Sequence, residues 1–405
     1  MNILSRGFCR SFQTIFRLAI PLLPYRQPKV LDSVTQLPEE LAQQNVQNVL
    51  IVTDKFLHTS GALEPLKQAL RRAHISCWIY DETVPNPTVE NVESARTLYL
   101  HKGCQALIGF GGGSAIDCAK AVGARIARPK KSISKMRGIL QVMKKIPYLI
   151  AIPTTAGTGS ETTVTTVITD GATHHKFPIS DFPLIPRVAV LDPENTRTLP
   201  PYLTATTGMD ALVHAIEAYI GGSTTKISRS DALLAAKLIS ENLEQAYADG
   251  CNMTARKNML TAAYHAGHAF SISYVGYCHA VAHSLGGQYH IPHGLANAVL
   301  IPYVLESYGP KAYNKLKDLA IAMSIADADT PAEDAAKALI QKIRDMNTAM
   351  GIPAKLTGIH AEDIPHMAKL AAKEANPLYP VPVLMDARAL EQFYYDVYDV
   401  MEDPQ

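Results

Sequence analysis

Two segments of the sequence carry residues that could bind a metal ion. Asp210 and His214 stand four residues apart in GMDALVHAIEAY, so on a helix both side chains leave the same face. Further on, CHAVAHSLGGQYHIPHG places His279 and His283 four residues apart and then adds His293. A pair from each of two helices predicts a site of three imidazoles and one carboxylate. This donor set suits ferrous iron or zinc better than calcium or magnesium, which favour oxygen ligands.

The choice of ligands stays open on spacing alone, because His283 is placed as well as His279. A single pair of this kind is common on amphipathic helices, but six of the 14 histidines lie between His265 and His293, and this clustering favours a metal site. We expect the second helix to break at Gly286-Gly287. Cys278 should point away from the ion as a buried thiol, since adjacent helical residues diverge by about 100°.

Composition indicates a soluble globular protein of two domains or one large one, with 405 residues and 47% hydrophobic content. The formal net charge of +1 and the lack of a long basic run offer no electrostatic footprint for nucleic acid. The six cysteines are dispersed without a C-x-x-C pair, which fits reduced thiols in the cytoplasm better than a disulfide framework.

Residues 1–31 form an N-terminal extension that holds four arginines and no acidic residue, with large apolar side chains between them. The apolar stretch LAIPLLP is too short for a transmembrane helix, which needs roughly 20 residues, and no cleavage site follows it. We predict an uncleaved amphipathic helix that covers the protein's own surface or a partner subunit. Firm membrane association is not expected, and loose membrane contact is the lesser alternative.

The rest of the chain changes character near residue 200. Before it, short β-rich runs alternate with helical stretches; after it the β-rich runs stop and helical periodicity continues, as in 231–247 and 332–351. We therefore predict an α/β domain over 32–198 and an all-helical domain over 199–405. The expected strands are near-continuously apolar, as in a parallel sheet buried on both faces, and cover 49–54, 75–81, 105–110 and 148–153.

Two polar loops at the ends of expected strands could hold a dinucleotide. After QALIGF, the run Gly111 to Gly113 allows close backbone approach, and Ser114 opens a helix whose N-terminus attracts a pyrophosphate. Ser114 and Asp117 resemble a capping box. The loop IPTTAGTGSETT should converge on the same cofactor, because the carboxyl ends of strands line the ligand crevice. Asp54, after the first expected strand, favours NAD over NADP by repelling a 2′-phosphate.

Taken together, GGGSAIDCAKAVGA, IPTTAGTGSETT, GMDALVHAIEAY and CHAVAHSLGGQYHIPHG resemble the signatures of the iron-containing, group III alcohol dehydrogenases in order and spacing. The resemblance runs from about residue 46 to about 390. It implies an α/β N-terminal dinucleotide-binding domain with a Rossmann-like parallel sheet, and an all-helical C-terminal metal-binding domain. This is a dehydroquinate synthase-like architecture.

The resemblance also implies roles for single residues. Asp210, His214, His279 and His293 match the family's metal ligands, and His283 matches a histidine near the nicotinamide that is not a ligand. Phe270 and Thr165 fall where the substrate pocket should be. The positions that match cofactor contacts are Asp54, Asn86, Gly111, Gly112, Gly113, Ser114, Thr154, Thr155, Thr158, Thr163, Val167 and Lys176.

The expected reaction is the interconversion of an alcohol and an aldehyde by hydride transfer to NAD(H), with Fe²⁺, or alternatively Zn²⁺, as Lewis acid. Family habit suggests a homo-oligomer, a dimer or larger, that acts on a small molecule. Substrate identity does not transfer, since some relatives carry asparagine at the Thr165 position and one kind carries cysteine where Ala372 stands. The alternatives are a hydroxyacid-oxoacid transhydrogenase, a dehydroquinate-synthase-like lyase and a non-enzymatic sensor. The helical half shows no basic cluster of the kind such a lyase needs.

Overall fold

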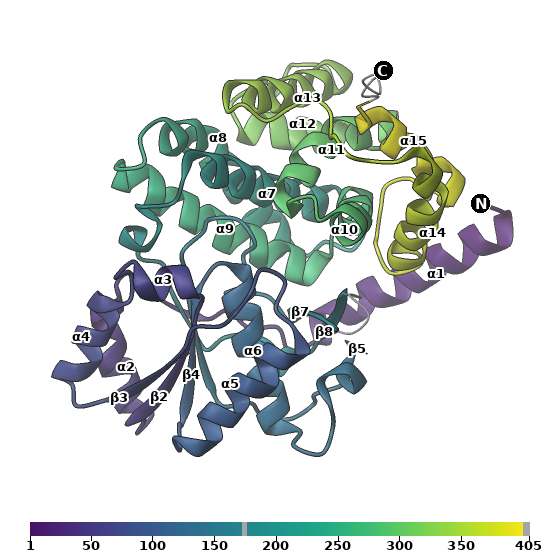
Figure 1. Cartoon of the computed structure of the whole chain (residues 1–405). Helices are drawn as coiled ribbons and strands as arrows, with labels where there is room; N and C mark the ends of the chain where they lie inside the picture. The colour runs from purple at the N-terminus through teal and green to yellow at the C-terminus, as the bar shows by residue number, and fades with distance from the viewer. Residues whose placement is uncertain (172–175, 400–405) are drawn as a thin grey trace, which may run out of the picture. The chain divides into compact units, whose positions relative to one another are not determined.

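The computed structural model describes residues 1–171 and 176–399, which form two compact units. One unit comprises Pro24–Leu199 and contains both sheets (Figure 1). The other combines Met1–Leu23 with the chain from Pro200 onward. The N-terminal helix is thus grouped with the helical unit, although the strands follow it directly in sequence.

The α/β unit is built on a six-stranded sheet in which every neighbouring pair is parallel. The prediction of a parallel sheet is confirmed. In spatial order the strands are β1 (Lys29–Leu31), β9 (Val188–Val190), β6 (Tyr148–Pro153), β4 (Ala106–Gly111), β2 (Asn48–Val52) and β3 (Ser76–Tyr80).

Helices cover both faces of this sheet, which explains the continuous apolar runs of its strands. In β2, Leu50 and Val52 pack into the core that includes α5 (Val89–His101) and α6 (Gly113–Ala127). Val49 and Ile51 pack into the core on the other face, which includes α2 (Leu37–Gln43) and α4 (Glu64–Arg72). The helices of this unit are η2 (Val34–Gln36), α2 (Leu37–Gln43), α3 (Lys55–Thr59), α4 (Glu64–Arg72), α5 (Val89–His101), α6 (Gly113–Ala127), η3 (Ile133–Met136), η4 (Phe182–Leu184) and η5 (Pro193–Thr196).

A second, three-stranded sheet follows the polar loop that comes after β6. Strand β7 (Thr165–Thr169) runs antiparallel to β8 (Lys176–Ser180), and β8 pairs in parallel with β5 (Gly138–Ile139). The residues of ETTVTTVITD alternate in burial over β7, where Thr166 and Ile168 are buried and Val167 is exposed. The segment before Thr165 is irregular rather than extended, because Thr162 and Thr163 turn back to bond Gly159 and Ser160.

The helical unit is organised around α7 (Pro201–Ile220), which is buried at nearly every position from Thr204 onward. Its described residues contain no named strand, as the sequence predicts. Around α7 the chain forms α1 (Ile3–Ala19), η1 (Ile20–Leu22), α8 (Lys226–Ala248), α9 (Met253–Ser273), α10 (Tyr277–Tyr289), α11 (His293–Tyr308), η6 (Gly309–Lys311), α12 (Tyr313–Ala322), α13 (Ala332–Ala349), η7 (Ala361–Asp363), α14 (Ile364–Ala375) and α15 (Ala387–Val397).

Candidate metal and cofactor sites

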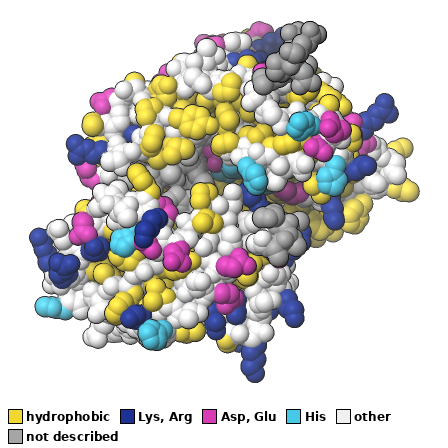
Figure 2. All heavy atoms as spheres, viewed as in Figure 1, with side chains coloured by type: hydrophobic (Ala, Val, Ile, Leu, Met, Phe, Trp, Pro, Cys, Tyr) yellow, Lys and Arg dark blue, Asp and Glu magenta, His cyan; other side chains and the backbone are white. Residues whose placement is uncertain are grey.

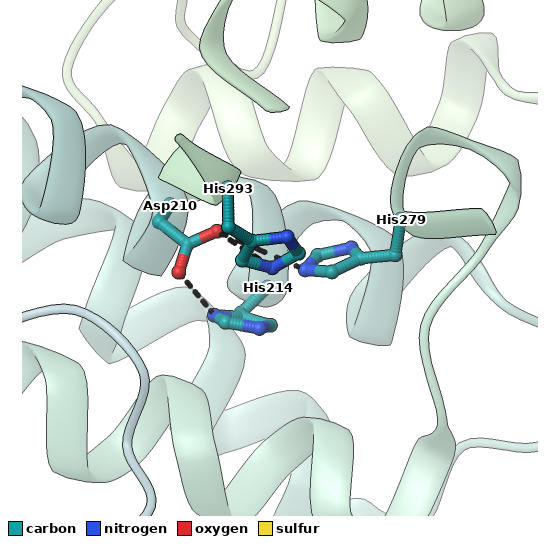
Figure 3. Close-up of side chains that lie close together, drawn as sticks. All are labelled: Asp210, His214, His279 and His293. Carbon is teal, nitrogen blue, oxygen red and sulfur yellow. Dashed lines mark ion pairs between the residues drawn. The ribbon is translucent and has the colours of Figure 1, made fainter. Parts of the chain in front are cut away.

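Four side chains of the helical unit lie together as a candidate metal site. One ligand atom from each of Asp210, His214, His279 and His293 falls within 4.8 Å of the others (Figure 3). Asp210 is the centre of the group: its Oδ1 lies 3.9 Å from His279 Nε2 and 3.5 Å from His293 Nε2, and its Oδ2 lies 4.0 Å from His214 Nδ1. These are spacings that a single ion can bridge.

The local chain explains how the four residues are positioned. Asp210 and His214 lie one turn apart on α7, as their spacing predicts. His279 comes from α10, but His293 opens a new helix, α11, so three helices build the site rather than two. Gly286 and Gly287 continue α10; the break comes at His290, whose φ is 55°, followed by Pro292. The expected break was therefore wrong by several residues, because proline and a left-handed residue end helices more effectively than paired glycines.

A buried glutamate orients His279. Glu217 Oε2 lies 2.6 Å from His279 Nδ1, and the same carboxylate accepts backbone N–H bonds from Gly276 at 2.8 Å and Cys278 at 2.9 Å. Burial raises the pKa of Glu217 to about 7. Burial, with the neighbouring histidines, holds the pKa of His279 well below its usual range. A neutral His279 that donates from Nδ1 to this acceptor keeps its Nε2 lone pair directed at Asp210.

The donor set fits a divalent ion. His279 Nε2 is buried and has no hydrogen-bond partner in the described parts of the chain. It stands 3.9 Å from a carboxylate oxygen, so two acceptors face each other at a distance that a shared cation would satisfy. Asn297 adds an amide, with Nδ2 at 2.7 Å from Asp210 Oδ1 and 3.1 Å from His293 Nε2. Cys278 is fully buried, with its thiol 3.5 Å from the Asn297 carbonyl, and it is not among the clustered ligand atoms, as predicted.

The remaining predicted residues of this unit lie beside the cluster. The Phe270 ring stacks on His214 with a centroid distance of 4.2 Å. His283 is outside the ligand group; its Nδ1 lies 2.7 Å from Glu374 Oε1, and its ring stacks on His293 at 5.1 Å. Tyr379 donates to the same Glu374 oxygen at 2.7 Å. His283 thus has the partners of an oriented base rather than those of a ligand.

Two glycines of the glycine loop in the α/β unit, Gly111 and Gly113, are packed too tightly to carry a side chain. A Cβ on Gly111, whose φ is +150°, would stand 2.8 Å from Ala115 Cβ. A Cβ on Gly113 would stand 2.9 Å from Thr158 Cγ2, and one on Gly112 would stand 3.5 Å from Thr155 Cγ2. The glycine loop and the threonine loop therefore lie against each other, and Thr154 N donates to Gly111 O at 3.0 Å.

The start of α6 differs from the expected capping box. The N-cap is Gly112, with no side-chain hydrogen bond, and Ser114 is the second residue of the helix. Asp117 instead accepts from Ser160 Oγ at 2.6 Å and from Val167 N at 2.9 Å. Because the carboxylate is used by the threonine loop and β7, the first amides of α6 are not capped by Asp117. They retain the arrangement in which a helix N-terminus binds phosphate.

Other predicted cofactor residues of this unit have structural partners of their own. Asp54 caps α3 by accepting from Leu57 N at 2.9 Å, and its Oδ2 is 3.9 Å from the Cβ position of Gly111. Asn86 has a φ of 59° and its N–H donates to Ser114 Oγ at 3.3 Å. Lys176 begins β8 and is half-buried, which lowers its pKa. Thr165 Oγ1 lies 2.9 Å from Ser180 Oγ.

A buried lysine, which the sequence analysis missed, holds the threonine segment. The Nζ of Lys120 on α6 donates to Thr163 O at 3.0 Å, Thr163 Oγ1 at 2.6 Å and Thr165 O at 2.8 Å. Burial lowers the pKa of Lys120 to about 8. Two of these bonds reach Thr163, which is predicted to contact the cofactor, and one reaches Thr165, which is predicted to line the substrate pocket. Lys120 therefore positions both residues.

Three further residues beside the candidate metal site were not predicted from the sequence: Glu217, Asn297 and Glu374. Glu217 follows Asp210 by seven residues and so shares its helix face, and Asn297 follows His293 by four. Those two spacings could have been read as signals. Glu374 is 91 residues from His283, and no local pattern links them.

The chain matches two family models that cover most of its length. One, described as iron-containing alcohol dehydrogenase, matches residues 30–193, and the other, described as the C-terminal part of the Fe-containing alcohol dehydrogenase family, matches 204–398. The chain is 36% identical over 366 residues to 1,3-propanediol dehydrogenase of Klebsiella pneumoniae, covering 89% of this chain and 94% of the relative. It is 36% identical over 346 residues to NAD-dependent methanol dehydrogenase of Bacillus methanolicus, covering 84% and 90%.

A solved structure agrees with these matches. The crystal structure of a 1,3-propanediol oxidoreductase superposes with a TM-score of 0.89 at 34% identity, and the alignment covers 92% of this chain and 99% of that one. The glycine loop lies within the first of the two ranges matched by the family models, and the four candidate metal ligands lie within the second. The chain is thus an oxidoreductase that belongs to the iron-containing alcohol dehydrogenase family.

Proposed function

We propose that this protein is a metal-dependent, NAD-linked alcohol dehydrogenase that interconverts a small alcohol and its aldehyde by hydride transfer. The observation that carries the proposal is the cluster of Asp210, His214, His279 and His293, four ligand atoms within 4.8 Å, in a chain that also has the glycine loop of a dinucleotide site. Relatives named for 1,3-propanediol and methanol support a small aliphatic alcohol as substrate. The name of one relative supports NAD.

The metal proposed is Fe²⁺, with Zn²⁺ as the alternative, because both accept imidazole together with carboxylate. Bound at these four ligands, a divalent ion would supply Lewis-acid polarisation that lowers the pKa of a substrate hydroxyl. Asp210 contributes the negative charge of the ligand set. Glu217 holds the Nδ1 proton of His279, so that Nε2 remains a donor of its lone pair.

The chain's own residues would handle cofactor and proton. The free amides at the start of α6 would bind the pyrophosphate, and Asp54 would favour NAD by repelling a 2′-phosphate. His283 Nε2 would take up the proton released from the alcohol, because the bond from Nδ1 to Glu374 leaves Nε2 as the acceptor. Phe270, stacked on His214, would form an apolar wall next to the reacting carbon.

The test is a pair of variants in protein loaded anaerobically with Fe²⁺ or Zn²⁺ and assayed with a panel of alcohols by NADH absorbance. His279→Ala should lose bound metal and turnover together, because it removes a ligand. His283→Ala should keep the metal and slow turnover by about 100-fold, as expected for loss of a general base. Full activity of metal-free His279→Ala, or loss of metal from His283→Ala, would contradict the assignment. Net NADH formation from an alcohol alone separates this activity from transhydrogenation, because a transhydrogenase passes the hydride on to a second, oxoacid substrate.

We further propose that the protein acts in the cytoplasm as a homo-oligomer. All six cysteines are free, which fits a reducing compartment. Strand β1 lies at one edge of the large sheet, and an edge strand is a surface on which a second copy can pair. Sedimentation of the loaded protein measures the assembly state directly.

A further inference from the structure

The inward face of the N-terminal helix α1 is part of the packed interior of the helical unit. The ranges matched by the family models begin at residue 30, so α1 lies outside them. It runs along an edge of the unit in Figure 1, and hydrophobic side chains are visible along this edge in Figure 2. On the inward side, Cys9 and Gln13 are buried. Among residues 1–171 and 176–399, no helix, α1 included, has the length and apolar character needed to cross a bilayer.

Gln13 bonds a loop that joins two helices of this unit. The loop is the 376–386 connection between α14 and α15, which contains no helix or strand, so its carbonyl groups need partners from elsewhere. Gln13 Nε2 donates to Pro377 O at 3.2 Å and to Tyr379 O at 2.7 Å. Its Oε1 accepts from Arg10 Nη1 at 2.9 Å. Every polar atom of this buried side chain is therefore paired, and two of its three bonds go to the connection.

Arg10 extends these contacts along the same connection. Its guanidinium donates to Val381 O and to Pro382 O, both at 2.8 Å. The amino terminus of Met1 pairs with Asp386, the last residue before α15. Because the bonds from α1 are spread over most of the connection, they restrain its backbone rather than a single side chain.

Aromatic packing adds a second contact with Tyr379. The Phe16 ring packs edge-on against Tyr274, with a centroid distance of 5.2 Å, and the Tyr274 ring lies 6.4 Å from that of Tyr379. Tyr274 has a φ of 63°, which bulky residues rarely adopt, so its surroundings must hold it there. Helix α1 thus restrains Tyr379 in two ways, at the backbone through Gln13 and at the ring through Tyr274.

Tyr379 links these contacts to the candidate active site. Its hydroxyl donates to Glu374 Oε1 at 2.7 Å, and His283 Nδ1 lies 2.7 Å from the same oxygen. Burial raises the pKa of Tyr379 well above its usual range, so the hydroxyl remains a donor. The Glu374 side chain is 36% exposed, so water competes for its oxygens and packing alone does not fix its rotamer. The orientation of Glu374 therefore depends on Tyr379.

We propose that Gln13 and Phe16 are positioning residues for the proposed alcohol dehydrogenase reaction. They hold Tyr379 in the place from which its hydroxyl fixes Glu374. Glu374 in turn orients His283, so this inference rests on the proposed role of His283 as the proton acceptor. These contacts include none of the four candidate metal ligands, and metal binding should not depend on α1.

The first test is the steady-state kinetics of Gln13→Ala in the full-length, metal-loaded protein. We expect kcat to fall about fivefold or more, because a small displacement of a positioned group lowers the rate, while KM and metal content stay at the wild-type level. Thr14→Ala is the matched control. Thr14 is exposed on the same helix, and its hydroxyl donates within α1 to Arg10 O at 2.8 Å. It should keep the wild-type kcat.

A double-mutant cycle separates positioning from a general loosening of the fold. Tyr379→Phe keeps the ring and removes the hydroxyl that donates to Glu374, so by itself it should lower kcat. Adding Gln13→Ala to Tyr379→Phe should change kcat by less than about twofold, because Gln13 acts through that hydroxyl. Two losses of kcat that multiply in the double variant would overturn the proposal.

A second variant and a second measurement cover the case in which Gln13→Ala does not fold. Phe16→Leu keeps an apolar side chain but removes the ring that packs on Tyr274, and it should lower kcat in the same direction. Hydrogen–deuterium exchange read by mass spectrometry does not require activity. The amides of the 376–386 connection should exchange faster in Gln13→Ala and Phe16→Leu than in the wild type and Thr14→Ala.

Wild-type kcat in both Gln13→Ala and Phe16→Leu would overturn the proposal, as would an equal loss of kcat in Thr14→Ala. A wild-type protein that forms no NADH from any alcohol would instead contradict the proposed function. Hydrogen exchange then decides whether α1 restrains the 376–386 connection: faster exchange in the variants supports this restraint, and unchanged exchange overturns it.

Discussion

At the scale of single residues, the candidate metal site depends on one carboxylate that does not belong to the ligand set. Glu217 accepts from two backbone amides and from His279 Nδ1, so every donor around it requires a carboxylate oxygen. An amide nitrogen in place of Oε2 would face the Gly276 N–H and the His279 N–H. The imidazole would then be driven to the tautomer that is protonated at Nε2 and cannot bind a metal.

We therefore expect Glu217→Gln to weaken metal binding about 10- to 100-fold, the usual cost of losing a partner that orients a ligand. Chelator competition with Zn²⁺ measures the affinity. Glu374→Gln is the matched control, because Glu374 contacts His283 and no ligand atom of the cluster. Unchanged affinity in Glu217→Gln would show that Glu217 only fills space.

Glu374 has its own prediction. Glu374→Gln should reduce kcat about tenfold or more while the metal content stays at the wild-type level, because His283 loses the acceptor that keeps Nε2 unprotonated. The pH profile of kcat should change with it. Glu362→Gln alters an exposed acid and should leave kcat unchanged. A higher KM with an unchanged kcat would assign Glu374 to substrate binding instead.

At the scale of secondary-structure elements, α6 and the threonine loop form one buried polar assembly. Lys120 donates to the backbone carbonyls of Thr163 and Thr165, and Asp117 accepts from Ser160 and Val167. Glu161, in the same loop, is also buried. The Oε1 atom of Glu161 has no hydrogen-bond partner in the described part of the chain. Burial raises the pKa of Glu161 to about 7, against the opposing pull of Lys120.

This pKa predicts the pH dependence of stability. The folded state holds a proton on Glu161 between its unfolded pKa near 4.5 and about 7, so stability should fall as pH rises through this window. Glu161→Gln should flatten the dependence, with a difference of at most about 3 kcal/mol above the window. Urea unfolding followed by the fluorescence of Trp78 measures it. Glu194→Gln, at an exposed acid of the same unit, should keep the wild-type slope.

At the scale of the whole molecule, the two units carry different parts of the chemistry. All four candidate metal ligands lie in the unit that contains α7, whereas the glycine loop and the single tryptophan, Trp78, lie in the α/β unit. Ligand binding stabilises only the folded state of the unit that holds the site.

Metal removal should therefore destabilise the helical unit and leave the stability of the α/β unit unchanged. When the free Zn²⁺ concentration is about 100 times the Kd, removing the metal should lower the free energy of unfolding of the helical unit by roughly 2.7 kcal/mol. The thermal transition seen by far-UV circular dichroism should move down, and the Trp78 fluorescence transition should stay in place. His279→Ala should show no shift on adding metal. Equal shifts of both transitions in the wild type would show that the units unfold as one cooperative body.

Local patterns in the sequence were sufficient to predict the helices and strands and part of the candidate metal site. Continuous apolar runs predicted the parallel strands, because strands covered on both faces bury every side chain. The four-residue spacing predicted that Asp210 and His214 share a face of α7, since helix geometry alone determines it. The four-part motif resemblance gave the family, which the comparisons confirm. The assignments of single cofactor and substrate residues stay predictions.

Only the tertiary structure decided which distant residues meet. Spacing could not choose between His279 and His283, and the fold brings one to Asp210 and the other to Glu374. In the structure the helix ends at His290 and not at Gly286-Gly287. Asp117 accepts a hydrogen bond from Ser160 and does not cap α6. Such choices depend on packing between segments tens of residues apart. A helix or strand period is a local property, whereas the partner of a buried polar group is whichever group the fold places within hydrogen-bond distance.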